Sequence, residues 1–270
     1  MPYDPNGNLI GQDMVGDVQV SGVPTSGQVI TATSSTTAIW STPTLLTPFP
    51  TIQIFSTVGT FNYTPTTGSV RYLRVRLVGG GGSGGSGSTS SSDGGGGGGS
   101  GGYIEKWYPM SNNQYVAKVG SGGAGRTTNA NGLNGTRSEW QQLQLFSPFA
   151  TLIDIADFGG AGEGAGNGSG GVGGGVGLNA INTQGTTSAT LWMAGGDGNP
   201  GDNTNGTHNG GSGGSNPLGQ GGQGGTQATA FPAKNSGGVP TGYGSGSGGS
   251  SANNSTPNGS SGVVIVEEYY

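Results

Sequence analysis

Few residues of this chain belong to the types that carry out nucleophilic or acid–base chemistry. Cysteine is absent, and the one histidine, His208, lies in the stretch NTNGTHNGG. A catalytic triad or an acid–base histidine needs partner side chains that converge on it. In a stretch this rich in glycine and asparagine, His208 is expected to be a solvated loop residue.

Two groups of carboxylates lie close together in sequence: Asp154, Asp157 and Glu163, and the adjacent pair Glu267 and Glu268. Two carboxylic acids are the usual means of hydrolysing a glycosidic bond. Domains that depolymerise glycans are usually larger than this one. The chain is therefore expected not to be an enzyme, and glycan hydrolysis by such a pair is the alternative.

Metal and nucleic-acid binding are both disfavoured. The stretch GGDGNPGDN resembles one turn of a calcium-binding repeat, but it offers only Asp197 and Asp202, whereas the repeat needs many aligned aspartates. No metal or other cofactor is expected. The 8 Lys and Arg are scattered and the net charge is −5, which argues against binding a phosphate backbone.

Aromatic side chains are the more informative candidates for binding, because Tyr and Trp are favoured anchors and their faces suit sugar rings or protein loops. Several lie in or beside insertions between glycine-rich stretches. The alternative is that they lie flat over the glycine and cap it. We predict that two or three are exposed at a tip and contact a receptor; the candidates are Trp140, Phe146, Phe149, Trp192, Phe231 and Tyr243.

Glycine sets the structure that must position these residues. It makes up 64 of 270 residues, while apolar residues make up 29% and charged residues 8%. Disordered chains usually combine low hydrophobicity with high charge, and this chain is low in both. The glycine is either a sticky low-complexity polymer or part of an unusual packed structure.

Alternating apolar and polar residues predict strands at both ends of the glycine-rich part. In VRYLRVRLV, for example, Leu73, Val75 and Leu77 alternate with Tyr72, Arg74 and Arg76. Short strands are also expected at 18–20 and 29–33, and the nearest candidate for a helix is Thr136–Phe146. The main predicted strands are 59–65, 70–78, 103–109, 114–120 and 262–270.

The strand at 262–270 is stable only if it meets the others, because a lone strand is not stable in water. About 140 glycine-rich residues precede it, and a structureless loop of that length is unusual inside a domain. We therefore predict that the glycine forms a bundle of polyglycine II helices, with 79–102 folded out and back around a turn at Ser88–Asp93. The alternative is a set of disordered linkers.

The order of these elements resembles the glycine-rich domain at the ends of bacteriophage fibre proteins. The resemblance rests on GTFNY, RVRLVGGGG, GGYIEKW, VGSGG and VVIVEE over residues 57–270. It implies an all-β or irregular fold: a small antiparallel sheet as base, polyglycine II helices and loop insertions. The N-terminal SGVPTSGQVITATSSTTAIW is similar to an element of phage fibre and head-fibre proteins, so residues 1–56 are expected to attach to the virion or to oligomerise.

The resemblance also implies a function. The chain is expected to be a non-enzymatic virion fibre protein, a receptor-binding adhesin that is assembled in the host cytoplasm. Its implied partners are other virion proteins, a bacterial surface glycan or outer-membrane protein, and two further copies in a homotrimer, with no nucleic acid. The alternative is a capsid head fibre or decoration protein with a structural role. An ice-binding protein would show regular threonine ladders, which the sequence lacks.

Overall fold

The computed structural model of the chain describes residues 13–15, 18–23, 25–26, 28–42, 49–87, 94–111, 114–127, 130–143, 150–156, 176–177, 190–202, 209–226, 236–251 and 254–270. The chain divides into two compact units, Met1–Phe49 and Pro50–Tyr270. The boundary predicted after residue 56 falls inside the second unit, because a strand at Thr51–Phe55 pairs with the C-terminal strand.

The first unit contains a four-stranded sheet in the order β1-β2-β4-β3. Its strands β2 and β4 are parallel and the other pairs are antiparallel. The strands predicted at 18–20 and 29–33 are confirmed as β2 and β3. The bounds are β1 Asp13–Val15, β2 Val18–Ser21, β3 Val29–Ala32 and β4 Thr37–Ser41.

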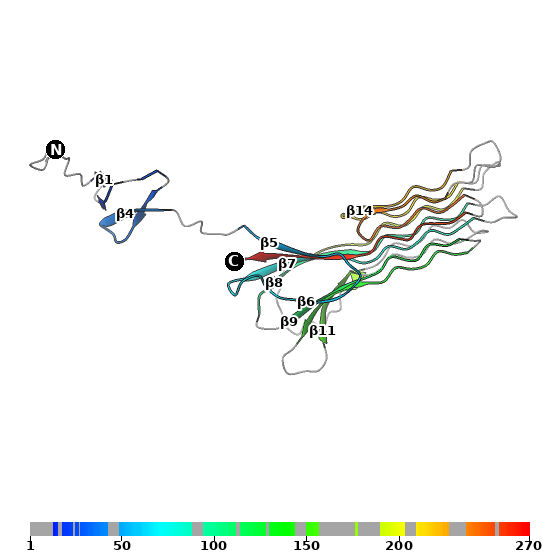
Figure 1. Cartoon of the computed structure of the whole chain (residues 1–270), viewed down its shortest axis with the longest axis horizontal. Helices are drawn as coiled ribbons and strands as arrows, with labels where there is room; N and C mark the ends of the chain where they lie inside the picture. The colour runs from blue at the N-terminus through cyan, green and yellow to red at the C-terminus, as the bar shows by residue number, and fades with distance from the viewer. Residues whose placement is uncertain are drawn as a thin grey trace, which may run out of the picture. The chain divides into compact units, whose positions relative to one another are not determined.

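Within its described residues, the second unit contains two five-stranded sheets and a small two-stranded one (Figure 1). One large sheet, called here the C-terminal sheet, has the order β13-β8-β7-β16-β5, and the other, the Trp140 sheet, has the order β12-β11-β10-β9-β6; β14 pairs with β15. The bounds are β5 Thr51–Phe55, β6 Gly59–Tyr63, β7 Tyr72–Val78, β8 Tyr103–Pro109, β9 Gln114–Val119, β10 Ser138–Leu143, β11 Ala150–Ala156, β12 Val176–Gly177, β13 Thr190–Met193, β14 Gly219–Gln220, β15 Thr241–Gly242 and β16 Val263–Tyr269.

All five main predicted strands are confirmed, and β16 closes the C-terminal sheet between β7 and β5. In β7 the apolar residues of the alternation are buried, while Arg74 and Arg76 lie on the opposite face. The run Val263–Val266 in β16 is buried throughout because both faces of that strand are covered. The fold is all-β, with no helix among the described residues.

The nearest candidate for a helix, Thr136–Phe146, is not helical in its described part, since Ser138–Leu143 is strand β10. It pairs with β9 on one side and β11 on the other, and Trp140 lies opposite Ala117. The segment has no helical repeat of apolar residues, and its Trp140 side chain enters the core between the sheets as part of a strand.

The main hydrophobic core lies between the two large sheets, because both contribute side chains to one cluster. The C-terminal sheet and the turn before β7 supply aliphatic side chains and Tyr108, and the Trp140 sheet supplies most of the aromatic ones. The buried members are Tyr63, Val70, Leu73, Val75, Leu77, Ile104, Tyr108, Tyr115, Ala117, Val119, Trp140, Val264 and Val266.

The described parts of the glycine-rich stretch 79–102 form the out-and-back pair that the sequence predicts. Residues 79–87 leave β7 and residues 94–102 return to β8, joined by backbone hydrogen bonds at every third residue. Bonds that repeat at every third residue are those of the left-handed threefold form of polyglycine II, and the described glycines of these two runs have no positive φ angle. The bonds are Gly79 N–H to Gly102 O at 3.2 Å, Gly82 N–H to Gly99 O at 2.8 Å and Gly85 N–H to Gly96 O at 2.8 Å.

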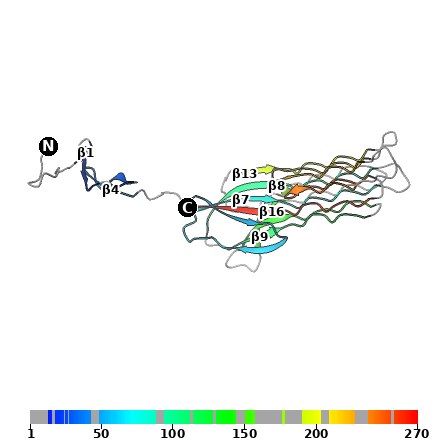
Figure 2. The same ribbon diagram turned by 45° about the horizontal axis from the view of Figure 1, so that its top comes forward.

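Successive residues of one run bond to different neighbours, as a threefold helix requires. Residues one position further along 79–87 donate to the run 130–137: Gly80 N–H to Thr136 O, Ser83 N–H to Leu133 O and Ser86 N–H to Ala130 O. The third residue of each turn of 79–87 donates hydrogen bonds to the runs 244–251 and 254–262. The bundle, called here the glycine bundle, consists of the parallel and antiparallel runs 79–87, 94–102, 120–127, 130–137, 194–202, 209–215, 221–226, 236–240, 244–251 and 254–262 (Figures 1 and 2).

Close approach of the runs demands glycine at particular positions. A Cβ atom on Gly98 would lie 2.3 Å from the carbonyl oxygen of Gly82, and one on Gly84 would lie 2.5 Å from that of Gly248. Both contacts are with backbone, so neither can be relieved by rotating a side chain. Packing in the glycine bundle therefore excludes even alanine there.

Serines in the glycine bundle occupy positions where a hydroxyl bridges two other segments. The Ser83 hydroxyl accepts from Leu133 N–H at 2.8 Å and donates to Ala124 O at 2.7 Å. The Ser247 hydroxyl likewise accepts from Gly84 N–H at 2.9 Å and donates to Pro257 O at 2.8 Å. Both serines are fully buried. Gly-Ser sequences are typical of flexible linkers, but here the serine hydroxyls hydrogen-bond neighbouring runs and hold them together.

Replacing Gly98 with alanine is expected to lower the free energy of unfolding by about 1–3 kcal/mol or more, because the backbone must shift to admit the methyl group. Gly68→Ala is the matched control: its Cβ would have no neighbour within 4 Å, so the change should stay within about 1 kcal/mol. Chemical denaturation of both variants measures the difference. Equal stability of the two would contradict close packing in the bundle.

Candidate functional site

The glycine bundle holds the ends of its runs together on the side away from the two large sheets (Figure 1). Hydrogen bonds continue to these ends, for example from Asp202 N–H to Asn209 O at 2.8 Å and from Gly95 N–H to Ser250 O at 2.9 Å. The connecting segments 88–93, 128–129, 203–208, 227–235 and 252–253 lie outside the described residues, and with them His208, Phe231 and the turn expected at Ser88–Asp93.

Trp140 is not a surface binding residue, which corrects the sequence prediction. Its side chain is fully buried in the main core. The indole stacks on Tyr115, with ring centres 5.3 Å apart and 13° between the planes, and meets Tyr63 edge-on at 5.4 Å. The strand alternation of β10 turns this side chain inward, so its place in an insertion between glycine-rich stretches did not make it a surface residue.

Of the other aromatic candidates, Trp192 and Tyr243 are among the described residues, and neither lies at the far end of the glycine bundle. Trp192 is 55% exposed, but it lies on β13 at the edge of the C-terminal sheet, opposite Ile104, and not at the far end of the bundle. Tyr243 is partly buried against a second apolar cluster of Val78, Tyr103, Val263 and Ile265. Phe146 and Phe149 lie outside the described residues.

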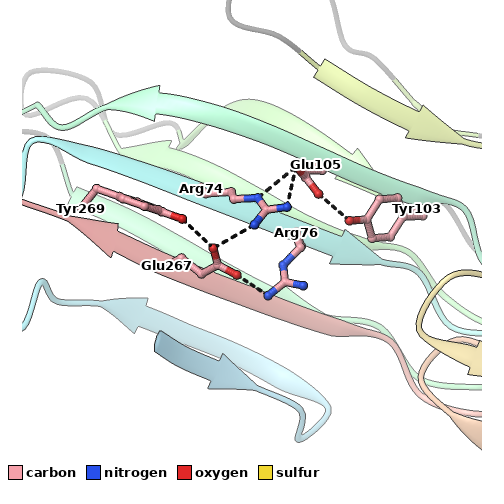
Figure 3. A network of polar contacts seen from close by, with 6 residues as sticks. All are labelled: Arg74, Arg76, Tyr103, Glu105, Glu267 and Tyr269. Atoms are coloured by element: carbon pink, nitrogen blue, oxygen red, sulfur yellow. Dashed lines mark hydrogen bonds and ion pairs between the residues drawn. The ribbon is translucent and has the colours of Figure 1, made fainter. Parts of the chain in front are cut away.

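A network of charges crosses the outer face of the C-terminal sheet (Figure 3). Arg74 lies between Glu105 on β8 and Glu267 on β16, with nitrogen–oxygen distances of 2.9 and 3.2 Å, and Arg76 also binds Glu267. Tyr103 donates to Glu105 at 2.8 Å, and burial together with this bond raises the pKa of Tyr103 to about 12. The network joins three neighbouring strands.

Glu268 is the other buried carboxylate of β16, and it lies on the core side of the sheet. It accepts hydrogen bonds from Tyr63 and Gln53, each at 2.8 Å, and from the backbone N–H of Thr66 at 3.1 Å. Burial raises the pKa of Glu268, but the bonds from Thr66, Tyr63 and Gln53 outweigh that effect and hold it below 4.5, its ordinary value. An ionised Glu268 thus joins β5, β6, β16 and the turn after β6.

Glu267 and Glu268 do not form a catalytic pair, because adjacent residues of a strand point to opposite faces. Glu267 binds arginines on the outer face and Glu268 binds hydroxyl, amide and backbone donors on the inner one. Asp157 and Glu163 of the other group are outside the described residues. In the part of the chain that the structure describes, no three His, Cys, Asp or Glu residues gather as a metal site.

A hollow of about 590 Å³ opens at the end of the two large sheets away from the glycine bundle. The turn between β6 and β7 forms one wall, and the ends of β8 and β9 form the other. Sequence reasoning missed it because its residues come from separate segments that carry no common motif. Its lining consists of Asn62, Tyr63, Thr64, Pro65, Thr67, Gly68, Val70, Met110, Ser111, Gln114 and Tyr115.

Comparison with known proteins gives the family of the second unit. Residues 56–269 match a family described as a glycine-rich domain. The chain belongs to this family. The match covers nearly all of the second unit, including the glycine bundle and every strand of the two large sheets except β5. No curated protein matches the chain significantly. Among the described residues, no helix has the length and apolarity needed to cross a membrane.

The buried carboxylate makes stability depend on pH. The pKa of Glu268 is lowered in the folded state. The ionised carboxylate therefore adds to the free energy of unfolding above pH 4.5, and this stabilisation is lost as pH falls through the lowered pKa. Glu268→Gln should cost about 1–3 kcal/mol at pH 7, since an amide leaves donors unsatisfied. The difference in stability between the two proteins should shrink as pH falls from 4.5 through the lowered pKa of Glu268. A difference that is the same at pH 3 and pH 7 would show that the charge of Glu268 is unimportant.

Proposed function

We propose that this protein is a non-enzymatic bacteriophage virion fibre protein that binds the bacterial surface. The observation that supports the proposal is the glycine bundle, whose hydrogen-bonded runs end together on the side away from the sheets. Such a bundle is suited to presenting connecting segments as a group. The resemblance of residues 57–270 to fibre-tip domains points to the same role.

The bundle acts as a stiff spacer in this function. The run 79–87 has nine residues, so at about 3.1 Å per residue it extends about 28 Å. Hydrogen bonds to neighbours on several sides fix the distances between the ends of the runs. Fixed ends reduce the ordering cost when the connecting segments bind a surface, and several copies on one virion gain avidity from weak single contacts.

The remaining parts have roles in attachment. The first unit would join the virion through other virion proteins or through a homotrimer, and the two large sheets would form the base of the bundle. The bound surface would be a glycan or an outer-membrane protein. A head fibre or decoration protein is the alternative, in which the bundle caps a structural rod and contacts no receptor.

Purified protein is expected to slow adsorption of the phage that carries it, because it occupies the same receptor. Phe231→Ala should weaken this competition about tenfold or more if that side chain is an anchor, while Trp192→Ala on the sheet serves as the matched control. Adsorption assays with intact cells measure both. A folded preparation that neither binds the host nor competes would overturn the adhesin role, and labelling of the virion would then locate the chain on head or tail.

A further inference from the structure

The hollow at the sheet end of the second unit has a built and rigid floor. Tyr63 and Tyr115 contribute to it and are 5% and 3% exposed. The Tyr63 hydroxyl is held by Glu268 at 2.8 Å, and that of Tyr115 pairs with the Ser111 hydroxyl at 2.8 Å. Trp140 packs against both rings. This floor needs no rearrangement to receive a ligand, which lowers the cost of binding.

The rim of the hollow is polar but carries no formal charge. Asn62, Thr64, Thr67 and Gln114 are exposed and supply amide and hydroxyl groups, while Val70 and Met110 add apolar surface. A charged ligand would lose hydration without finding an opposite charge among the lining residues. The combination suits a neutral ligand that has many hydroxyl groups and at least one apolar face.

We propose that this hollow is a binding site for one or two rings of a neutral saccharide. Its volume of about 590 Å³ lies within the range of small-molecule sites. The partly exposed side chains of Pro65 and Met110 would receive the C–H face of a ring above the buried tyrosines, and the amides and hydroxyls of the rim would bind its hydroxyl groups. The site goes beyond the proposed function, because it lies at the opposite end of the unit from the segments that the glycine bundle presents.

Gly68 allows the hollow to be blocked without disturbing the fold. It lines the hollow, and a Cβ atom there would have no neighbour within 4 Å. Gly68→Trp should therefore fill the space, whereas Gly68→Ala should leave most of it open. Asn62→Ala and Gln114→Ala remove amides from exposed rim positions. Thr60→Ala, an exposed residue of β6 outside the hollow, is the matched control.

The experiment uses the full chain and saturation-transfer NMR with glucose, galactose, N-acetylglucosamine and their short β-linked oligomers, followed by calorimetry for those that bind. At least one saccharide is expected to bind, with affinity reduced tenfold or more by Gly68→Trp and at least threefold by each amide removal. Thr60→Ala, outside the hollow, should leave the affinity within twofold of the wild type.

Three outcomes would overturn the proposal: no binding of any of these sugars, sugar binding that survives Gly68→Trp, or occupation of the hollow by a peptide of another virion protein in place of sugar. The adsorption assay separates this site from the proposed function. Gly68→Trp protein that still competes for host cells while binding no sugar supports the saccharide site and leaves the adhesin role intact.

Discussion

The backbone hydrogen bond between neighbouring glycine-rich runs is the interaction on which the second unit depends. Ordering glycine is costly in conformational entropy, more so than for any other residue. One hydrogen bond contributes only about 1 kcal/mol net, so an isolated out-and-back pair would not stay folded. Each run of the glycine bundle instead bonds to several neighbours, and the cost is offset by the lattice of bonds as a whole.

The sheets hold the runs in place for that lattice. Strands β7, β9 and β13 lead directly into runs of the bundle, and β8, β10 and β16 receive runs from it. Strand neighbours in a sheet are about 4.8 Å apart, which is close to the separation that glycine helices need. The core around Trp140 therefore supports the bundle by fixing where its runs begin, and the bundle returns the chain to the sheets at the correct strand.

The sequence predicted the strands and the out-and-back pair because both depend on local signals. The alternation in VRYLRVRLV is visible in any short window, and the run 79–102 has a strand on each side. The inward position of Trp140 was missed because its strand has few apolar residues. The hollow and the two environments of Glu267 and Glu268 were missed because they arise from pairing between segments far apart in sequence, and low-complexity runs give no local sign of which neighbour each will meet.

The hydroxyl bridges of the glycine bundle make the spacing of its serines meaningful. Ser83 and Ser86 are three residues apart, as are Ser247 and Ser250, and all four are buried. A threefold helix turns about 120° per residue, so inserting one residue in a run would rotate every later side chain toward the wrong neighbour. Related chains should therefore change the length of their glycine runs in steps of three, while the connecting segments vary freely. Each run thus has a three-residue repeat of contacts, and an insertion that is not a multiple of three would shift it.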